Sequence, residues 1–166
     1  MKQLLSATLL FLASCTTIPG ATDPVREADG SSRAAVEAVL DAFHDAAALA
    51  DGEAYFGAMA EGSVFLGTDA TERWDREAFR GYADPYFSQG RGWTYKPIER
   101  HVYVRGEVAW FDERLWNEKY GESRGTGVLR RFAQGWRIVH YSLTFPIPNA
   151  ISGEVTKQIR ALSEDS

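Results

Sequence analysis

The sequence predicts an α+β domain in which helices cover one face of an antiparallel β-sheet. Apolar residues recur at helical spacing in the first half of the chain, and they alternate with polar residues in the second half. Short segments that contain glycine divide the alternating part into four long strands. Helices that precede a run of antiparallel strands gather on one face of the sheet.

Three helices and one short strand are expected before position 90. The apolar residues of the first helix fall on one stripe, and Asp51-Gly52 ends it. Asp75 is the N-cap candidate of the third helix, and Pro85 predicts a kink or an early end of that helix. In chain order, we expect a helix from 33 to 50, a helix over 53–60, a strand over 63–67 and a helix over 75–88.

Four long strands are expected after Gly92. Glycine lies in each of the three segments that would connect them, and Pro146 and Pro148 stop the last strand. A surface helix or a loose tail follows from Asn149. The expected strands cover 93–104, 108–119, 124–132 and 136–145.

The composition is that of one mildly acidic domain. The chain has 166 residues and a formal net charge of -5, and an acidic domain is a poor binder of nucleic acid. It contains no glycine-rich phosphate loop, no GxSxG motif and no paired CxxC motif. The three histidines have no metal-ligand spacing, so neither a metal nor another cofactor is expected. All aromatic residues except Phe11 lie between Phe43 and Phe145, a density that can both fill a core and line a cavity.

The first 14 residues have the features of an export signal. A basic start precedes an apolar run over 4–13, which has about half of the ~20 residues that a membrane-spanning helix needs. The stretch Leu12-Ala13-Ser14-Cys15 resembles the lipobox of bacterial lipoproteins. The resemblance implies that Cys15 becomes the lipid-modified first residue after cleavage. The alternative is an ordinary cleaved signal with an incidental cysteine.

Four segments are therefore expected along the chain. Acyl chains on Cys15 would anchor the protein to a membrane, because two or three chains hold firmly where one holds only marginally. The lipoprotein resemblance also implies the outer membrane and the periplasm, since Thr16 stands where an Asp would favour the inner membrane. The segments are a signal peptide over 1–14, a flexible tether over 15–31, a globular domain over 32–149 and a tail or short helix over 150–166.

Three stretches resemble the SnoaL-like branch of the nuclear transport factor 2-like superfamily. They are "VFLGTDATERW", "GEVAWFDERLW" and "RGTGVLRRFAQGWRIVHYSLTFPIPN", and the resemblance covers about residues 32–149. It implies a cone-shaped fold, with a curved antiparallel sheet packed on three N-terminal helices and a pocket between them. In members with known activity, one or two carboxylates or a histidine act as acid or base in that pocket, without a cofactor.

Glu113 is the first candidate for acid–base chemistry. One face of its strand carries Glu113 and Phe111 and is the more apolar, so we take it as the inner face. A carboxylate among apolar neighbours holds its proton more tightly, which raises its pKa towards neutrality. Two alternatives remain open. The face with Trp110 and Asp112 is the inner one, or an arginine such as Arg124 pairs with Glu113, lowers its pKa and makes it structural.

His140 and Asp69 are the other two catalytic candidates. His140 shares a face of the last strand with Ile138 and Ser142, and the alternative role is that of a hydrogen-bonded sheet histidine. Asp69 lies between a strand and a helix, where loops often form the mouth of a cavity. Asp69 and the nearby Glu72 either bind a substrate or form a turn and cap the next helix.

Seven further residues are candidates for lining a ligand pocket. His44 flanks the apolar stripe of the first helix and could instead be a residue at the edge of the core. Trp74 and Trp93 are expected in the pocket wall or the core. The complete set is His44, Trp74, Tyr82, Trp93, Phe111, Arg124 and Ser142.

Two functions from different classes follow from these features. The first is a lipid-anchored envelope protein that binds a small organic ligand in an apolar pocket, with or without cofactor-free isomerase, cyclase or dehydratase chemistry. The second is a non-catalytic envelope module for binding or dimerisation, whose pocket is filled by its own aromatic side chains. A homodimer formed through the outer face of the sheet is the expected protein partner, besides the small-molecule ligand and the membrane.

Overall fold

The computed structural model describes residues 30–164. The predicted signal peptide, the lipidation site Cys15 and nearly all of the predicted tether lie outside the described residues. Within residues 30–164, no helix is both long enough and apolar enough to cross a membrane.

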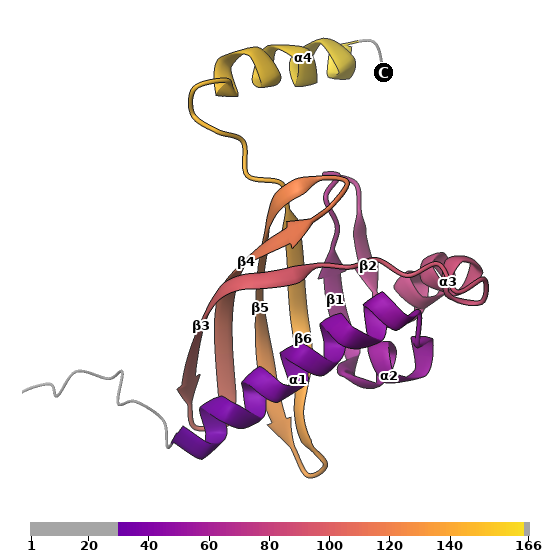
Figure 1. Cartoon of the computed structure of the whole chain (residues 1–166), viewed down its shortest axis with the longest axis vertical. Coiled ribbons are helices and arrows are strands. Elements are labelled where there is room, and N and C mark those ends of the chain that lie inside the picture. Colours follow the sequence, from indigo (N-terminus) through magenta and orange to yellow (C-terminus); the bar gives the residue numbers. More distant parts are fainter. Residues whose placement is uncertain (1–29, 165–166) are drawn as a thin grey trace, which may run out of the picture.

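The centre of the fold is a curved six-stranded sheet with the strand order β2-β1-β6-β5-β4-β3 (Figure 1). Neighbouring strands run antiparallel, except that β1 and β6 are parallel. The sheet is therefore mixed rather than purely antiparallel as predicted, because the free edge of β6 pairs with a strand far away in the sequence. The strands are β1 (Met59–Leu66), β2 (Arg73–Asp75), β3 (Lys96–Arg105), β4 (Val108–Asn117), β5 (Gly121–Phe132) and β6 (Gly135–Thr144).

Three helices gather on one face of the sheet, as predicted, and a fourth follows β6. The helix α1 crosses this face and packs against β3 and β6, whereas α2 and α3 lie towards the β1 end (Figure 1). The apolar stripe of α1 is buried and includes Val36, Leu40 and Phe43. The helices are α1 (Gly30–Leu49), α2 (Gly52–Gly57), α3 (Arg76–Phe87) and α4 (Ser152–Glu164).

The helix ends follow local chemistry. The carboxylate of Asp51 accepts a hydrogen bond from the Ala54 amide at the start of α2, and Asp75 does the same for Ala78 at the start of α3. Pro85 lies inside α3, which ends two residues later. The predicted cap at Asp75 is therefore confirmed, and α3 runs past Pro85 to within one residue of the predicted end at position 88.

Some boundaries differ from the prediction. The strand β1 begins at Met59, so α2 is shorter than the predicted helix over 53–60. The strand β2 was not predicted, because three residues are too few to show alternation. The helix α1 starts at Gly30, inside the predicted tether.

A bulge in β6 changes which of its side chains face the helices. On β5, Val128 pairs with His140 and Leu129 pairs with Ile138, so Val139 is an extra residue in β6. The inner face of β6 therefore carries Trp136 and Ile138 before the bulge and Tyr141 and Leu143 after it. The aromatic residues on the inner face of the whole sheet and on the helices form one buried core. It includes Phe43, Tyr55, Phe56, Phe65, Phe79, Phe111 and Tyr141.

Two glycines on the inner face of β5 make room for large neighbours. A Cβ on Gly125 would overlap the Tyr141 hydroxyl and come within 2.7 Å of Glu113 Oε1. A Cβ on Gly127 would overlap the carbonyl of His140 and lie 2.8 Å from the Phe111 ring. Neither glycine has a positive φ, so these positions need glycine for space alone.

We predict that Gly125→Ala destabilises the domain by about 1–3 kcal/mol, because the added methyl overpacks a full interior. The matched control is Gly81→Ala on α3, where nothing lies within 4 Å of the added Cβ and the helix should gain about 0.5–1 kcal/mol. Urea unfolding of both variants measures the difference. Equal stability of Gly125→Ala and the wild type would contradict the close packing described here.

Candidate functional site

A buried polar cluster lies beneath α1 on the inner face of the sheet. Glu113 on β4 is 1% exposed, and its Oε1 lies 2.8 Å from Nε2 of His44 on α1. The hydroxyl of Tyr141 donates to the same oxygen over 3.0 Å, and Nε of Arg100 on β3 donates to Oε2 over 2.7 Å. Four secondary-structure elements therefore meet at one carboxylate.

The charges of this cluster compensate one another. Burial raises the pKa of Glu113, but His44 and Arg100 outweigh burial and hold it below its usual value of 4.5. Burial and the charge of Glu113 raise the pKa of Tyr141 well above 10, so its hydroxyl stays protonated and donates. Arg100 also binds Asp41 on α1, with 2.6 Å between Nη1 and Oδ1. The cluster is thus an ion-paired network that joins α1 to the sheet.

The prediction that Glu113 lies on the inner face is confirmed, and the expected raised pKa is wrong. Trp110 and Asp112 lie on the outer face, as the alternation in the exposure of β4 shows. The arginine that pairs with Glu113 is Arg100, opposite it on β3, and not Arg124. Arg124 pairs with Arg114 in the β4–β5 ladder, on the outer face. A paired, ionised glutamate of this kind is structural.

His140 and Ser142 also lie on the outer face, and the prediction that His140 shares a face with Ile138 is wrong. The bulge at Val139 reverses the alternation, which a regular pattern cannot reveal. Gly127 and Leu129 on β5 are buried and face inward, so Val128 between them faces outward. His140 pairs with Val128 and therefore points outward too, away from Glu113.

Asp69 closes a turn between β1 and β2. Its Oδ1 accepts hydrogen bonds from the amide of Thr71 over 2.8 Å and from the hydroxyl of Thr71 over 2.6 Å. These bonds lower the pKa of Asp69 below its usual value of 3.8. The arrangement matches the turn-forming alternative for Asp69, and the neighbouring Glu72 accepts from the Asp69 amide over 3.1 Å.

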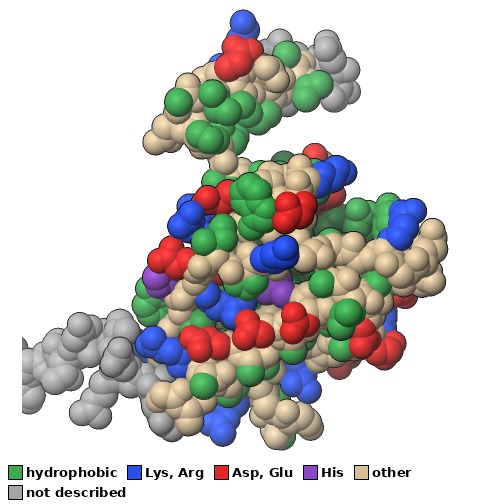
Figure 2. Space-filling model, in the orientation of Figure 1, with side chains coloured by type: hydrophobic (Ala, Val, Ile, Leu, Met, Phe, Trp, Pro, Cys, Tyr) green, Lys and Arg blue, Asp and Glu red, His purple; other side chains and the backbone are tan. Residues whose placement is uncertain are grey.

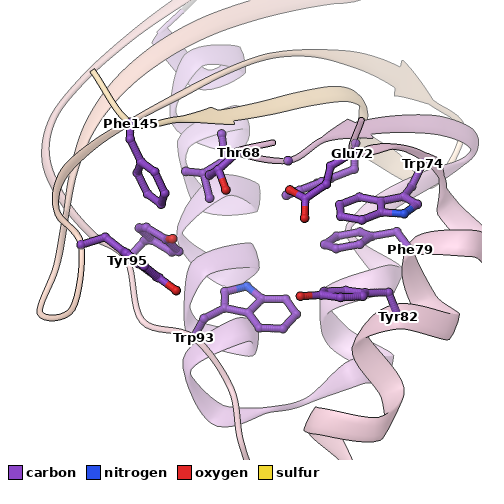
Figure 3. A pocket seen from close by; sticks show the side chains of 12 residues that line it. Thr68, Glu72, Trp74, Phe79, Tyr82, Trp93, Tyr95 and Phe145 are labelled. Atoms are coloured by element: carbon purple, nitrogen blue, oxygen red, sulfur yellow. The ribbon is translucent and has the colours of Figure 1, made fainter. Parts of the chain in front are cut away.

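An open pocket of about 360 Å³ lies beside this turn, between the β1–β2 end of the sheet and α3 (Figure 3). Trp74, Phe79 and Tyr82 form one wall, and Trp74 stacks on the other two rings with centroid distances of 5.3 and 5.2 Å. The segment before β3 supplies the facing side chains of Trp93 and Tyr95. Further lining residues are Phe65, Gly67, Thr68, Glu72, Tyr120, Leu143 and Phe145.

The polar side-chain groups of the pocket are one carboxylate, the hydroxyl groups of Thr68 and three tyrosines, and the indole N–H groups of two tryptophans. In Figure 3 the carboxylate of Glu72 points into the pocket beside Trp74. Burial, Tyr86 and Glu72 together raise the pKa of Tyr82, and burial raises the pKa of Tyr95 to about 12. Both hydroxyl groups are therefore protonated at neutral pH and can donate hydrogen bonds to a ligand.

The pocket and the buried cluster are separate sites that share a wall. Phe65 lines the pocket and stacks on Tyr141, with 5.5 Å between the ring centroids. Tyr141 in turn donates to Glu113. Neither Glu113 nor His44 lines the pocket, and Phe111 is a core residue that is 3% exposed.

Three of the predicted pocket residues, Trp74, Tyr82 and Trp93, do meet in the pocket. Glu72, named with Asp69 as a possible substrate-binding residue, also lines the pocket, whereas Asp69 does not. The residues that the prediction missed include Tyr95 and Tyr120. No sequence pattern predicts Tyr95 and Tyr120 as pocket residues, because both lie next to strand ends. The curvature of the sheet brings them to this pocket.

Comparison with known proteins yields a family and a fold. The profile of the family described as SnoaL-like domain matches residues 36–148. A comparison with curated proteins found no match.

Solved structures share the fold at low sequence identity. A nuclear transport factor 2-like protein of unknown function from Pseudomonas putida is 13% identical with a TM-score of 0.62, over 73% of this chain and 91% of its own. A candidate dehydratase of the same fold family from Streptomyces avermitilis is 14% identical with a TM-score of 0.63, over 72% and 100%. A candidate aromatic ring hydroxylase from Novosphingobium aromaticivorans is 18% identical with a TM-score of 0.63, over 74% and 94%. These similarities show the nuclear transport factor 2-like fold.

We predict that Glu113→Gln destabilises the domain by about 3 kcal/mol at pH 7, because it leaves the buried Arg100 without its main counter-charge. The folded pKa of Glu113 is lowered, so its stabilising contribution is complete above the unfolded value near 4.5 and is lost as the pH falls through the folded pKa. The stability difference between variant and wild type should therefore shrink below pH 4.5 in urea unfolding. The control is Asp112→Asn on the outer face, which should change stability little, and a Glu113→Gln variant as stable as wild type would refute the structural role.

Proposed function

The chain belongs to the SnoaL-like domain family, and on that premise we propose that it binds a small, largely apolar organic molecule in the aromatic pocket. The observation that carries the proposal is the pocket of about 360 Å³ lined by aromatic rings. This volume falls in the range of about 300–1,000 Å³ that is typical of ligand sites. A module whose aromatic residues filled its own interior would have a much smaller cavity.

The pocket combines what a ligand site needs. Its rings offer flat apolar surfaces on facing walls, which favour a planar or compact ligand. The Glu72 carboxylate and the hydroxyl groups of Thr68, Tyr82 and Tyr95 supply a few polar contacts that can orient it. The buried cluster keeps Tyr141, and through it Phe65, in place behind the pocket.

Cofactor-free proton transfer in the same pocket is the second candidate function. It is favoured by one observation, namely that Glu72 is the carboxylate among the lining residues. Glu72 would take a proton from the ligand, and a tyrosine hydroxyl would donate a hydrogen bond to the oxygen on which negative charge develops. In this proposal Glu72 replaces Glu113, His140 and Asp69, because none of these three lines the pocket.

The leader supports a proposal about location. A lipid-modified Cys15 would hold the domain at the cell envelope, in the outer membrane and facing the periplasm. The segment between Cys15 and Gly30 would carry the domain away from the membrane surface. The expected homodimer stays a prediction.

We predict that Thr68→Trp weakens the binding of 2-naphthol, a neutral aromatic probe, by at least tenfold. Thr68 is an exposed residue of the pocket rim, so an indole there fills the cavity without disturbing the core. The matched control is Ala70→Trp, an exposed position in the same turn that does not line the pocket. Isothermal titration calorimetry measures both affinities, and equal binding by the two variants would exclude this pocket as the site.

We predict that wild-type protein expressed in a bacterial host enters the detergent phase of a Triton X-114 extraction, whereas Cys15→Ser stays in the aqueous phase. The reason is that the serine hydroxyl cannot receive the thioether-linked lipid. Ser14→Ala, which keeps a small residue before the cysteine, should behave like the wild type. If Cys15→Ser entered the detergent phase like the wild type, the proposal of a lipid anchor on Cys15 would be refuted.

A further inference from the structure

We propose that the ligand of the aromatic pocket is an organic cation with a tertiary or quaternary ammonium group, held by the Glu72 carboxylate among aromatic rings. This inference rests on the proposed function, because it names the chemical class of ligand for the same pocket. It is carried by the charge of the lining residues and by their aromatic character.

The lining of the pocket carries one uncompensated negative charge. Glu72 is the acidic member among the twelve lining residues, and none of the twelve is Lys, Arg or His. Among residues 30–164, Glu72 forms no ion pair, and its Oε2 accepts a hydrogen bond from the Asp69 amide. The charge of Glu113, in contrast, is neutralised by Arg100, with 2.7 Å between Oε2 of Glu113 and Nε of Arg100.

This charge selects against acidic ligands. An organic carboxylate or phosphate in the pocket would face Glu72 without a basic side chain to compensate the repulsion. A cationic ligand would supply the missing counter-charge. The half-buried position of Glu72 strengthens the attraction, since screening by water is weaker there than on an open surface.

The aromatic walls suit an alkylated ammonium group. Trp74, Tyr82, Trp93 and Tyr95 surround the space that Glu72 faces in Figure 3, and tryptophan and tyrosine rings attract cations. Two tyrosine rings of the domain already contact a basic side chain in this way. Lys119 Nζ lies 4.7 Å from the ring centroid of Tyr120, and Arg91 lies 5.0 Å from that of Tyr86.

The same lining argues against a metal ion or a primary ammonium group. A hard metal cation needs six or more oxygen ligands, and a primary ammonium group has three N–H donors to satisfy. The pocket offers one carboxylate, and its other side-chain oxygens are the neutral hydroxyl groups of Thr68 and the tyrosines, set among aromatic ring surfaces. A tertiary or quaternary ammonium group has at most one N–H donor, and its alkyl groups can contact the rings.

The experiment compares choline with 3,3-dimethylbutan-1-ol. This alcohol has the same shape as choline, but a neutral carbon replaces the charged nitrogen. We expect the protein to bind choline at least tenfold more tightly in isothermal titration calorimetry at low ionic strength. Glu72→Gln should weaken choline binding and reduce its preference over the neutral alcohol, because only the attraction of the aromatic rings for the cation remains. The matched control, Glu107→Gln, removes the same charge from an exposed turn outside the pocket and should keep the preference.

Each outcome decides the inference separately from the proposed function. Equal affinity for the two compounds, no binding of choline, or a preference that Glu72→Gln leaves unchanged would overturn the inference. The neutral probe 2-naphthol carries no charge, so its binding to the wild type reports on the pocket itself, whether or not choline is preferred. If the protein binds 2-naphthol but shows no preference for choline, the proposed ligand-binding function stands and an organic cation is excluded as the ligand.

Discussion

The buried charge of Glu113 is the constraint on which the rest of the structure depends. A carboxylate at the centre of the inner sheet face must be neutralised and fully hydrogen-bonded, because an unpaired buried charge is very costly. His44, Arg100 and Tyr141 meet this demand from α1, β3 and β6. Satisfying one side chain therefore aligns a helix with three strands of the sheet.

This constraint extends to the pocket through a chain of contacts. Tyr141 reaches Glu113 only because Gly125 leaves space between them and because the bulge at Val139 turns Tyr141 inward. The Tyr141 ring then stacks on Phe65, which in turn stacks on Phe79 and lines the pocket. The shape of the pocket wall thus depends on a polar network that no ligand in the pocket would touch.

Glu113 and Glu72 differ in how their charges are compensated. Glu113 is enclosed and paired with Arg100, and its low pKa reflects a completed charge balance. Glu72 lies at the mouth of an open pocket and has an amide as its hydrogen-bond donor. A charge that the protein itself compensates holds a fold together, whereas one that it leaves uncompensated is available to a ligand.

Local sequence patterns predict most helices and strands of the fold, but they do not predict how the candidate site is arranged. Helical periodicity, the Asp75 cap and the glycine turns predict most helices and strands correctly, because these signals depend on residues a few positions apart. The inner face of β4 also follows from alternation alone.

What the sequence by itself determined is the order of the elements, the family resemblance and a pocket partly lined by Trp74, Tyr82 and Trp93. Only the tertiary structure decided that Arg100 rather than Arg124 neutralises Glu113, that His140 faces outward and that Glu72 is the carboxylate of the pocket. The physical reason is that strand register, a single bulge and the curvature of the sheet bring together residues far apart in the chain. One extra residue in a strand reverses every side chain after it, and no local pattern records that it is there.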